Sequence, residues 1–268
     1  MKLRPLMILL AVFVVVVASL LIVQTLRQAS KGPAGPPASP APSSFAQTTP
    51  AAKVGLTIDR RIARYPALAQ KLYRDGVKDL RSFAEQAKGD QAHLQAKGMP
   101  TRAYARTIAW TLAAATPRVV SVKQAWLDDT GGAHPNHGSS GLLWDPAADR
   151  EVERSDLFRP AADQGRLDQR LCQAIKAEKL RHQGAVGDVQ TWRCPKWADS
   201  DFVLAPSTVA GKAGGLIFLF DPYAIGPYVE GGYAVTIPLE AFKADLAPAY
   251  AAAFAGEPLE SDDGPANG

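Results

Sequence analysis

The chain has 268 residues, of which 30 are basic and 26 acidic, giving a formal net charge of +4. Four of the basic residues, Lys2, Arg4, Arg27 and Lys31, flank an apolar N-terminal run, and removing them leaves 26 basic against 26 acidic residues. The rest of the chain is neutral by count and has no basic patch interleaved with aromatic residues, so a nucleic-acid partner is not indicated.

The first predicted element is a membrane-spanning helix over residues 6–26 (LMILLAVFVVVVASLLIVQTL). This uncharged run is long enough, at roughly 1.5 Å per residue, to cross a hydrocarbon core of about 30 Å. The apolar core of a cleavable signal peptide is shorter, about 7–15 residues, so we interpret residues 1–27 as an uncleaved signal anchor, with cleavage as the alternative. The short basic tail before the run predicts a cytoplasmic N-terminus, and hence an inner-membrane protein whose C-terminal domain lies in the periplasm.

Residues 28–52 are rich in Pro, Ala, Ser and Gly. Such a segment cannot bury enough apolar surface to offset the entropy lost on ordering, and its prolines favour an extended chain. We therefore expect a disordered linker, followed by one globular domain over residues 53–252. The polar, acidic residues 253–268 are expected to form a disordered tail.

Within the domain, residues 54–64 alternate weakly and indicate a strand. Pro66 is well placed to start a helix, whose apolar residues recur at helical spacing until Gly98 interrupts the pattern. Residues 101–115 carry apolar side chains at even positions, as on a half-buried strand. Two further strands are predicted at 118–127 and 140–144, with a loop at 128–140 between them.

Residues 165–182 predict an amphipathic helix with an apolar stripe of Leu167, Leu171, Ile175 and Leu180. Strands follow at 201–205, 215–220 and 233–237, and a short helix is expected at 239–250. Strands joined by turns, with helices at intervals and no regular βαβ repeat, predict an α+β fold. Its sheet is expected to be mainly antiparallel with packed helices, preceded by one transmembrane helix.

Cys172 and Cys194 are the two cysteines of the chain. Outside the cytoplasm an even pair is readily oxidised, so we predict a disulfide. It would tie the helix at 165–182 to the turn at Cys194 and, in the chain-entropy model, stabilise the fold by roughly 3 kcal/mol.

The most unusual local sequence is the loop at 129–136 (DTGGAHPN). Gly131 and Gly132 permit positive φ, and Pro135 stiffens the turn. One interpretation is a ligand-binding loop that presents His134 and Asn136. The other is a tight connection whose polar side chains satisfy its own backbone.

His134 and His137 are three residues apart, which invites a metal interpretation, but no third His or Cys lies nearby, and further ligands would have to come from Asp128 and Asp129. Since a zinc site takes three or four ligands, no metal is predicted. A second candidate segment, residues 222–228 (PYAIGPY), holds Tyr223 and Tyr228 on a proline-stiffened loop. Rigid aromatics suit a glycan or protein surface, but they equally suit a packed lid over a sheet edge.

Two motifs carry a resemblance to a known family. The first is residues 131–136 (GGAHPN), with SDLF at 155–158; the second is GLIF at 215–218, continuing through DPYAIGPY at 221–228 to VTIP at 235–238. Over roughly residues 54–250 the chain resembles the extracytoplasmic domain of RsiV-type anti-sigma factors and the non-catalytic N-terminal region of PdaC-type peptidoglycan deacetylases.

The resemblance implies an α+β module of the cell envelope, which binds lysozyme in the anti-sigma branch. Two departures limit what it implies. Only about five residues are expected on the cytoplasmic side, too few to hold a sigma factor, and the metal-binding deacetylase domain is not seen. Because the domain is neutral by count, steering of a cationic protein such as lysozyme is not predicted either.

The chain has no recognisable nucleophile elbow and no phosphate-binding glycine pattern, so no enzyme activity and no cofactor are expected. The favoured hypothesis is a membrane-anchored periplasmic module that binds a lysozyme-like protein or peptidoglycan. Ligand contacts are expected from Gly131, Gly132, His134, Pro135 and Asn136 together with Tyr223 and Tyr228. The alternatives are an envelope hydrolase acting through the His134 and Asn136 loop, and a passive structural domain.

Overall fold

The computed structural model of the chain describes residues 41–183 and 192–259. The predicted anchor at 6–26 lies outside these residues. Within them, no helix is both long and apolar enough to span a bilayer.

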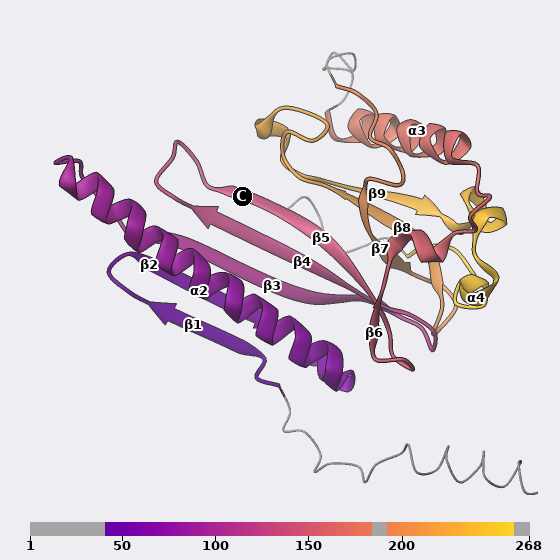
Figure 1. Ribbon diagram of the computed structural model, residues 1–268. Helices are drawn as coiled ribbons and strands as arrows, with labels where there is room; N and C mark the ends of the chain where they lie inside the picture. Colours follow the sequence, from indigo (N-terminus) through magenta and orange to yellow (C-terminus); the bar gives the residue numbers. More distant parts are fainter. Residues whose placement is uncertain (1–40, 184–191, 260–268) are drawn as a thin grey trace, which may run out of the picture. The chain divides into compact units, whose positions relative to one another are not determined.

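The first half of the domain forms a six-stranded sheet whose strands are in chain order (Figure 1). The strands are β1 (Ser44–Thr48), β2 (Ala52–Ile58), β3 (Tyr104–Ala115), β4 (Val120–Asp129), β5 (Asn136–Asp145) and β6 (Arg150–Val152). Neighbours are antiparallel except for β2 and β3, which are parallel. A parallel pair needs a long crossover, and helix α2 (Pro66–Ala96) supplies it.

The second half forms a three-stranded antiparallel sheet of β7 (Asp201–Pro206), β8 (Ala213–Phe220) and β9 (Tyr233–Pro238). Helix α3 (Gln164–Gln183) packs beside it. The remaining elements are short: η1 (Arg60–Arg64), η2 (Arg154–Leu157), η3 (Tyr228–Glu230), η4 (Leu239–Ala241), η5 (Lys243–Asp245) and α4 (Pro248–Ala251). The prediction of an α+β fold with a mainly antiparallel sheet is confirmed.

Alternation along the strands separates two cores. On β4, Val120 and Val122 face the core beneath α2, whereas Ser121 points to the other face, where its hydroxyl accepts the Leu204 N–H of β7 at 3.0 Å. Figure 1 shows α2 lying across β2 and β3, and α3 beside the sheet of β7, β8 and β9. A side chain at Gly141 would collide with the Phe202 carbonyl, so glycine there permits the close approach of β5 and β7.

Several predicted elements match the structure closely. Helix α2 begins at Pro66 and ends before Gly98, whose φ is +67°. In β3, Ile108 and Trp110 are buried as the even-position pattern requires. The predicted stripe of α3 is correct for three of its four residues, Leu167, Leu171 and Ile175, which are all fully buried.

Other boundaries were wrong. The strand expected at 54–64 ends at Ile58, because Asp59 caps η1 by accepting the Arg61 N–H. Strand β1 (Ser44–Thr48) lies within the segment expected to be a disordered linker. The loop expected at 128–140 is shorter, since β4 extends to Asp129 and β5 begins at Asn136.

Near the C-terminus, three short turns of helix replace the single helix expected at 239–250. The first part of the expected tail is packed rather than disordered. Phe254 is 6 % exposed, and the Leu259 N–H donates to the Pro206 carbonyl at 2.9 Å. Residues 260–268 lie outside the described residues.

Candidate functional site

The structure brings the two candidate loop segments together. The ring of His134 stacks on that of Tyr228 with centroids 3.7 Å apart and planes at 25°. The Tyr228 hydroxyl donates to the Pro135 carbonyl at 2.6 Å, and the Tyr223 hydroxyl lies 3.4 Å from His134 Nε2. We call His134, His137, Tyr223 and Tyr228 the aromatic patch, since the His137 ring also meets Tyr228 edge-on at 5.7 Å.

The patch faces solvent. Tyr223 is 64 % exposed and Val229, next to Tyr228, is 90 % exposed. Tyr223 also has a φ of +72°, a conformation that costs a non-glycine residue of order 1 kcal/mol or more. An exposed aromatic ring held in a strained backbone conformation is more typical of a recognition surface than of a lid over the core.

The 129–136 loop is fixed by ion pairs at its base. Arg102 pairs with both oxygens of Asp129 at 2.5–2.8 Å, and the Asp129 carboxylate also accepts the Gly131 N–H at 3.0 Å. The Arg102 hydrogen bonds hold the pKa of Asp129 below its usual value. Gly131 has a φ of +87°, and Gly132 is exposed. The loop therefore does satisfy its own backbone, and it also presents His134 to the patch.

Asn136 is exposed at the first position of β5, and no hydrogen bond of its side chain is seen within the described residues. Asp221, which follows β8, reaches the same strand and accepts the Ser139 N–H at 2.7 Å. Burial raises the pKa of Asp221, an effect that the Ser139 bond partly opposes. A side chain at Gly138 would collide with Asp221 and Trp126, so this glycine lets Asp221 approach β5.

Lys179 of α3 contacts the segment that carries both tyrosines. This role of Lys179 was not predicted from the sequence. Lys179 is 5 % exposed and donates to the Ile225 carbonyl at 2.8 Å and to the Glu230 carboxylate at 2.6 Å. The Tyr233 hydroxyl donates to the same carboxylate at 2.6 Å. Lys179 takes the inward position that the sequence analysis gave to Leu180, which is 56 % exposed. The helical spacing could have predicted this, because residue 179 lies four residues after Ile175 and therefore on the same face of the helix.

The predicted disulfide is present. Cys172 on α3 and Cys194 are bridged, with their Cα atoms 5.3 Å apart. The bridge ties α3 to the chain that follows residue 191. Among the described residues, no group of three or more His, Cys, Asp or Glu side chains is arranged to hold a metal ion.

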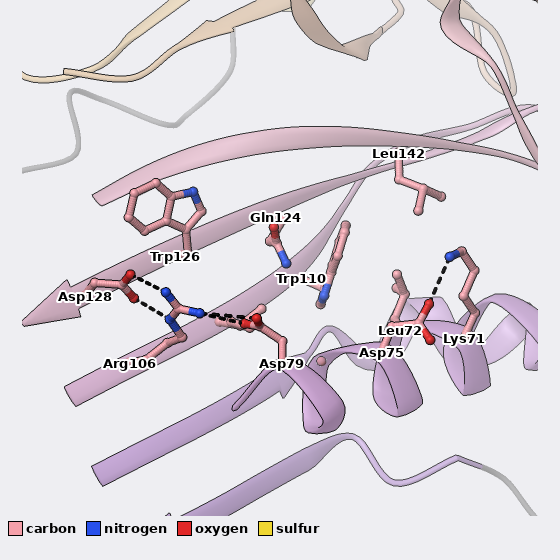
Figure 2. Close-up of a pocket in the computed structure, with 12 residues that line it drawn as sticks. Lys71, Leu72, Asp75, Asp79, Arg106, Trp110, Gln124, Trp126, Asp128 and Leu142 are labelled. Atoms are coloured by element: carbon pink, nitrogen blue, oxygen red, sulfur yellow. Dashed lines mark hydrogen bonds and ion pairs between the residues drawn. The ribbon is translucent and has the colours of Figure 1, made fainter. Parts of the chain in front are cut away.

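A second feature is a groove between α2 and strands β3, β4 and β5, with a volume of about 430 Å³ (Figure 2). Arg106 lies at one end, paired with Asp128 at 2.6–2.7 Å and with Asp79 at 3.1 Å. Lys71 lies at the other end and donates to Asp75 at 2.9 Å. Burial raises the pKa of Asp75, but the Lys71 hydrogen bond and charge outweigh it and the pKa is lowered.

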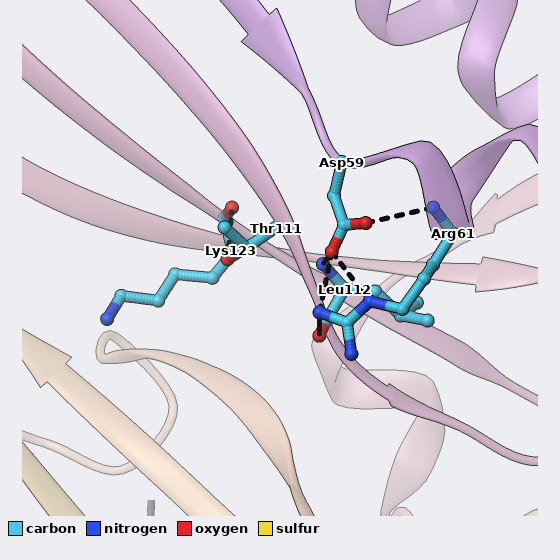
Figure 3. Close-up of polar contacts among 5 residues, drawn as sticks. All are labelled: Asp59, Arg61, Thr111, Leu112 and Lys123. Atoms are coloured by element: carbon cyan, nitrogen blue, oxygen red, sulfur yellow. Dashed lines mark hydrogen bonds and ion pairs between the residues drawn. The ribbon is translucent and has the colours of Figure 1, made fainter. Parts of the chain in front are cut away.

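Beyond the groove, the junction of β2 and η1 is fixed by Asp59 (Figure 3). Its carboxylate accepts the Arg61 N–H and guanidinium at 2.6–2.8 Å and the Leu112 N–H of β3 at 3.3 Å. The Arg61 side chain lowers the pKa of Asp59 to about 2.

The second half of the domain matches a known family model. Residues 155–240 match DUF3298, a family described as proteins of unknown function. The DUF3298 segment contains α3, β7, β8, β9 and the loop with Tyr223 and Tyr228. It does not include the 129–136 loop, which precedes it in the chain and contributes the histidines of the patch. No curated protein matches the chain.

Two solved DUF3298 proteins resemble the chain over most of its length. The crystal structure of one from Pseudomonas aeruginosa PAO1 is 18 % identical, with a TM-score of 0.54, and the match covers 83 % of this chain and 99 % of that one. One from Bacteroides fragilis NCTC 9343 is 17 % identical, with a TM-score of 0.52 and coverages of 77 % and 92 %. At these identities the likeness shows a shared fold, which extends beyond the DUF3298 segment.

Proposed function

We propose that this protein is a non-catalytic binding module of the cell envelope, anchored in the inner membrane by residues 6–26, with its domain in the periplasm. The observation that carries the proposal is the aromatic patch. Two segments about 90 residues apart, each singled out by its sequence, meet there through a His134–Tyr228 stack and a Tyr228–Pro135 hydrogen bond.

The chemistry of the patch supports recognition rather than catalysis. His134 Nδ1 lies 3.1 Å from the Pro135 carbonyl, and Nε2 faces the Tyr223 hydroxyl at 3.4 Å. Neither contact supplies the carboxylate that would orient a histidine as a general base. The exposed ring of Tyr223, beside the half-buried ring of Tyr228, instead provides a large, rigid contact area, which is the usual make-up of a binding hot spot.

A protein partner fits the patch better than a glycan. The exposed apolar side chain of Val229 extends the surface beside Tyr228, and a contiguous exposed apolar surface is typical of a protein-interaction site. The resemblance to the RsiV-type domain suggests a lysozyme-like protein as this partner, with peptidoglycan as the alternative. The disulfide is consistent with an oxidising compartment outside the cytoplasm.

The test is calorimetric titration of the full chain in detergent with lysozyme and, separately, with soluble muropeptides. We expect saturable lysozyme binding that Tyr223→Ala weakens by about 30-fold or more, the loss of a typical hot spot. Met99→Ala is the matched control, because Met99 is 50 % exposed and lies outside the patch. Binding of muropeptides but not of lysozyme would show that the ligand is peptidoglycan rather than a protein. Silence with both ligands, from folded protein, would refute the proposal.

The membrane arrangement is tested separately. A C-terminal alkaline phosphatase fusion, which is active only after export, should be active and should fractionate with the inner membrane. An inactive fusion of normal abundance would refute the periplasmic location.

A further inference from the structure

We propose that a cavity at the start of helix α3 is a second binding site, which takes a dipeptide with apolar side chains and free termini. The cavity is lined by residues of η2, the first residue of α3, the start of β7 and the residue before α4. Its volume of about 540 Å³ lies within the range of roughly 300–1,000 Å³ that is typical of small-ligand sites. It shares no residue with the aromatic patch.

The wall of the cavity is built from aromatic rings. Phe158 is half-buried, and its ring meets the rings of Trp197 and Phe202 edge-on, with centroids 5.6 and 6.3 Å apart. Trp197 and Phe202 are 2 % and 1 % exposed, so packing in the core fixes both rings. A largely apolar wall of this kind favours a ligand with apolar side chains, which displace water from it.

Two opposite charges at the cavity are left without partners. Arg159 and Asp156 both line it and are both exposed, yet neither side chain makes an ion pair or hydrogen bond within the described residues. The third charged residue of the lining, Arg154, already pairs with Asp201. One unpaired positive charge and one unpaired negative charge are complementary to a ligand that carries both signs, and they disfavour a ligand with a net charge.

Two uncharged polar side chains can bind a peptide group between these charges. Gln164 and Ser155 line the cavity and are exposed, and the structure shows no hydrogen bond from either side chain to another described residue. A glutamine amide both donates and accepts, as the C=O and N–H of a peptide bond require. A free amino acid has no peptide bond to use them. A dipeptide therefore matches Asp156 with its ammonium group, Arg159 with its carboxylate and Gln164 with its peptide group.

The cavity also gives a role to a sequence motif that the aromatic patch does not use. In the motif at residues 155–158 (SDLF), Leu157 is fully buried in the core, whereas Ser155, Asp156 and Phe158 line the cavity. Apart from Arg154 and Ala247, the whole lining belongs to the segment that matches DUF3298. The motif thus fixes the cavity wall through one residue and offers the other three to the ligand.

The test follows the full chain, labelled with 5-fluorotryptophan in detergent, by ¹⁹F NMR. The chain has five tryptophans, and the signal of Trp197 is identified by its loss in Trp197→Phe. Titration with the dipeptide leucyl-phenylalanine should shift this signal saturably. The signals of the tryptophans that do not line the cavity should stay in place.

Two blocked probes test the charged termini separately. N-acetyl-leucyl-phenylalanine lacks the ammonium group and leucyl-phenylalaninamide lacks the carboxylate, and each should bind about fivefold more weakly, the upper end for an exposed charge pair. Arg159→Met should weaken binding of the free dipeptide by the same factor and should no longer distinguish it from the amide. Asp156→Asn should no longer distinguish it from the N-acetyl form.

Arg170→Met is the matched control, because Arg170 is an exposed arginine of α3 that does not line the cavity, and its affinity should equal that of the wild type. A Trp197 signal that the free dipeptide does not move would overturn the proposal. Equal affinity of the wild type for the free and both blocked forms would overturn it too, whatever the variants do. The site does not depend on the proposed function, since Tyr223→Ala removes part of the patch and leaves the cavity residues in place.

Discussion

The groove and the aromatic patch differ in the kind of structure that forms them. The groove rests on regular elements, a long helix and three strands, and each of its charged side chains has an opposite charge beside it. The patch rests on two loops, and its contacts are ring stacking and hydrogen bonds to backbone carbonyls. A surface made of loops needs supports from elsewhere in the fold, and here those supports are Lys179 and Asp221. The comparison therefore predicts that the two surfaces can be damaged separately.

The largest effect is expected for Lys179→Met. The change removes the Lys179 partner of the Glu230 carboxylate, whose side chain is 16 % exposed, and breaking a buried ion pair costs roughly 3–5 kcal/mol. The free energy of unfolding from urea titration should fall by about 3 kcal/mol. The patch should lose its affinity for its protein partner, while the groove beside α2 should keep its structure.

Lys176→Met is the control, because Lys176 is an exposed residue on the same helix. We expect its stability to stay within about 0.5 kcal/mol of the wild type, as is usual for surface substitutions. If both variants behaved alike, Lys179 would not be the support that the structure indicates.

Removing the disulfide should have the next largest effect. Cys172 and Cys194 are 22 residues apart, and a loop of this size implies about 3 kcal/mol, although such bridges often deliver less. The double variant Cys172→Ser/Cys194→Ser should lower the unfolding free energy by about 2–3 kcal/mol. Wild-type protein treated with a reductant should unfold at the same urea concentration as the variant. A reductant effect on the double variant itself would show that another process is responsible.

How far these features could be predicted from the sequence depends on whether the residues that form them are close together in the chain. Helix α2 and strand β3 follow from local periodicity, since Pro66, Gly98 and the even positions of β3 are all visible in the sequence. The disulfide follows from there being two cysteines. The meeting of His134 with Tyr228 does not, because local patterns carry no information about which loops converge. Both segments were predicted as candidates, but as separate sites.

The missed features share a physical cause. Lys179 is buried as an ion pair, so hydrophobicity alone assigned its inward position to the neighbouring Leu180. The groove depends on Arg106, Asp79 and Asp128 from three different elements, and on the parallel pairing of β2 with β3 that places α2 over the sheet. Strand β1 was assigned to the linker because the segment around it is rich in Pro, Ala, Ser and Gly, yet β1 pairs with β2 and its Phe45 packs against the core.

A smaller effect is expected on the groove side of the molecule, at Asp59. Its pKa of about 2 lies below the ordinary value of 3.8, so its contribution to stability is complete above pH 3.8 and is lost as the pH falls toward 2. We expect about 1 kcal/mol, less than the shift alone implies, because the partner Arg61 is 59 % exposed. Asp59→Asn should lower stability at pH 6, and the difference from wild type should shrink below pH 3.8. A difference that persists unchanged at pH 2 would contradict the assignment.

The smallest effect, on the patch side, should have the opposite sign. Burial raises the pKa of Asp221, so the folded state favours the protonated form. The resulting stability is complete below the ordinary pKa of 3.8 and is lost as the pH rises through the raised value. Asp221→Asn keeps an oxygen that can accept the Ser139 N–H and has no charge to lose. Urea titrations from pH 3 to pH 7 should therefore show this variant gaining stability relative to wild type as the pH rises. Asp59→Asn should lose stability relative to wild type between pH 2 and pH 4, and two slopes of the same sign would mean that the two carboxylates do not differ in the way their surroundings imply.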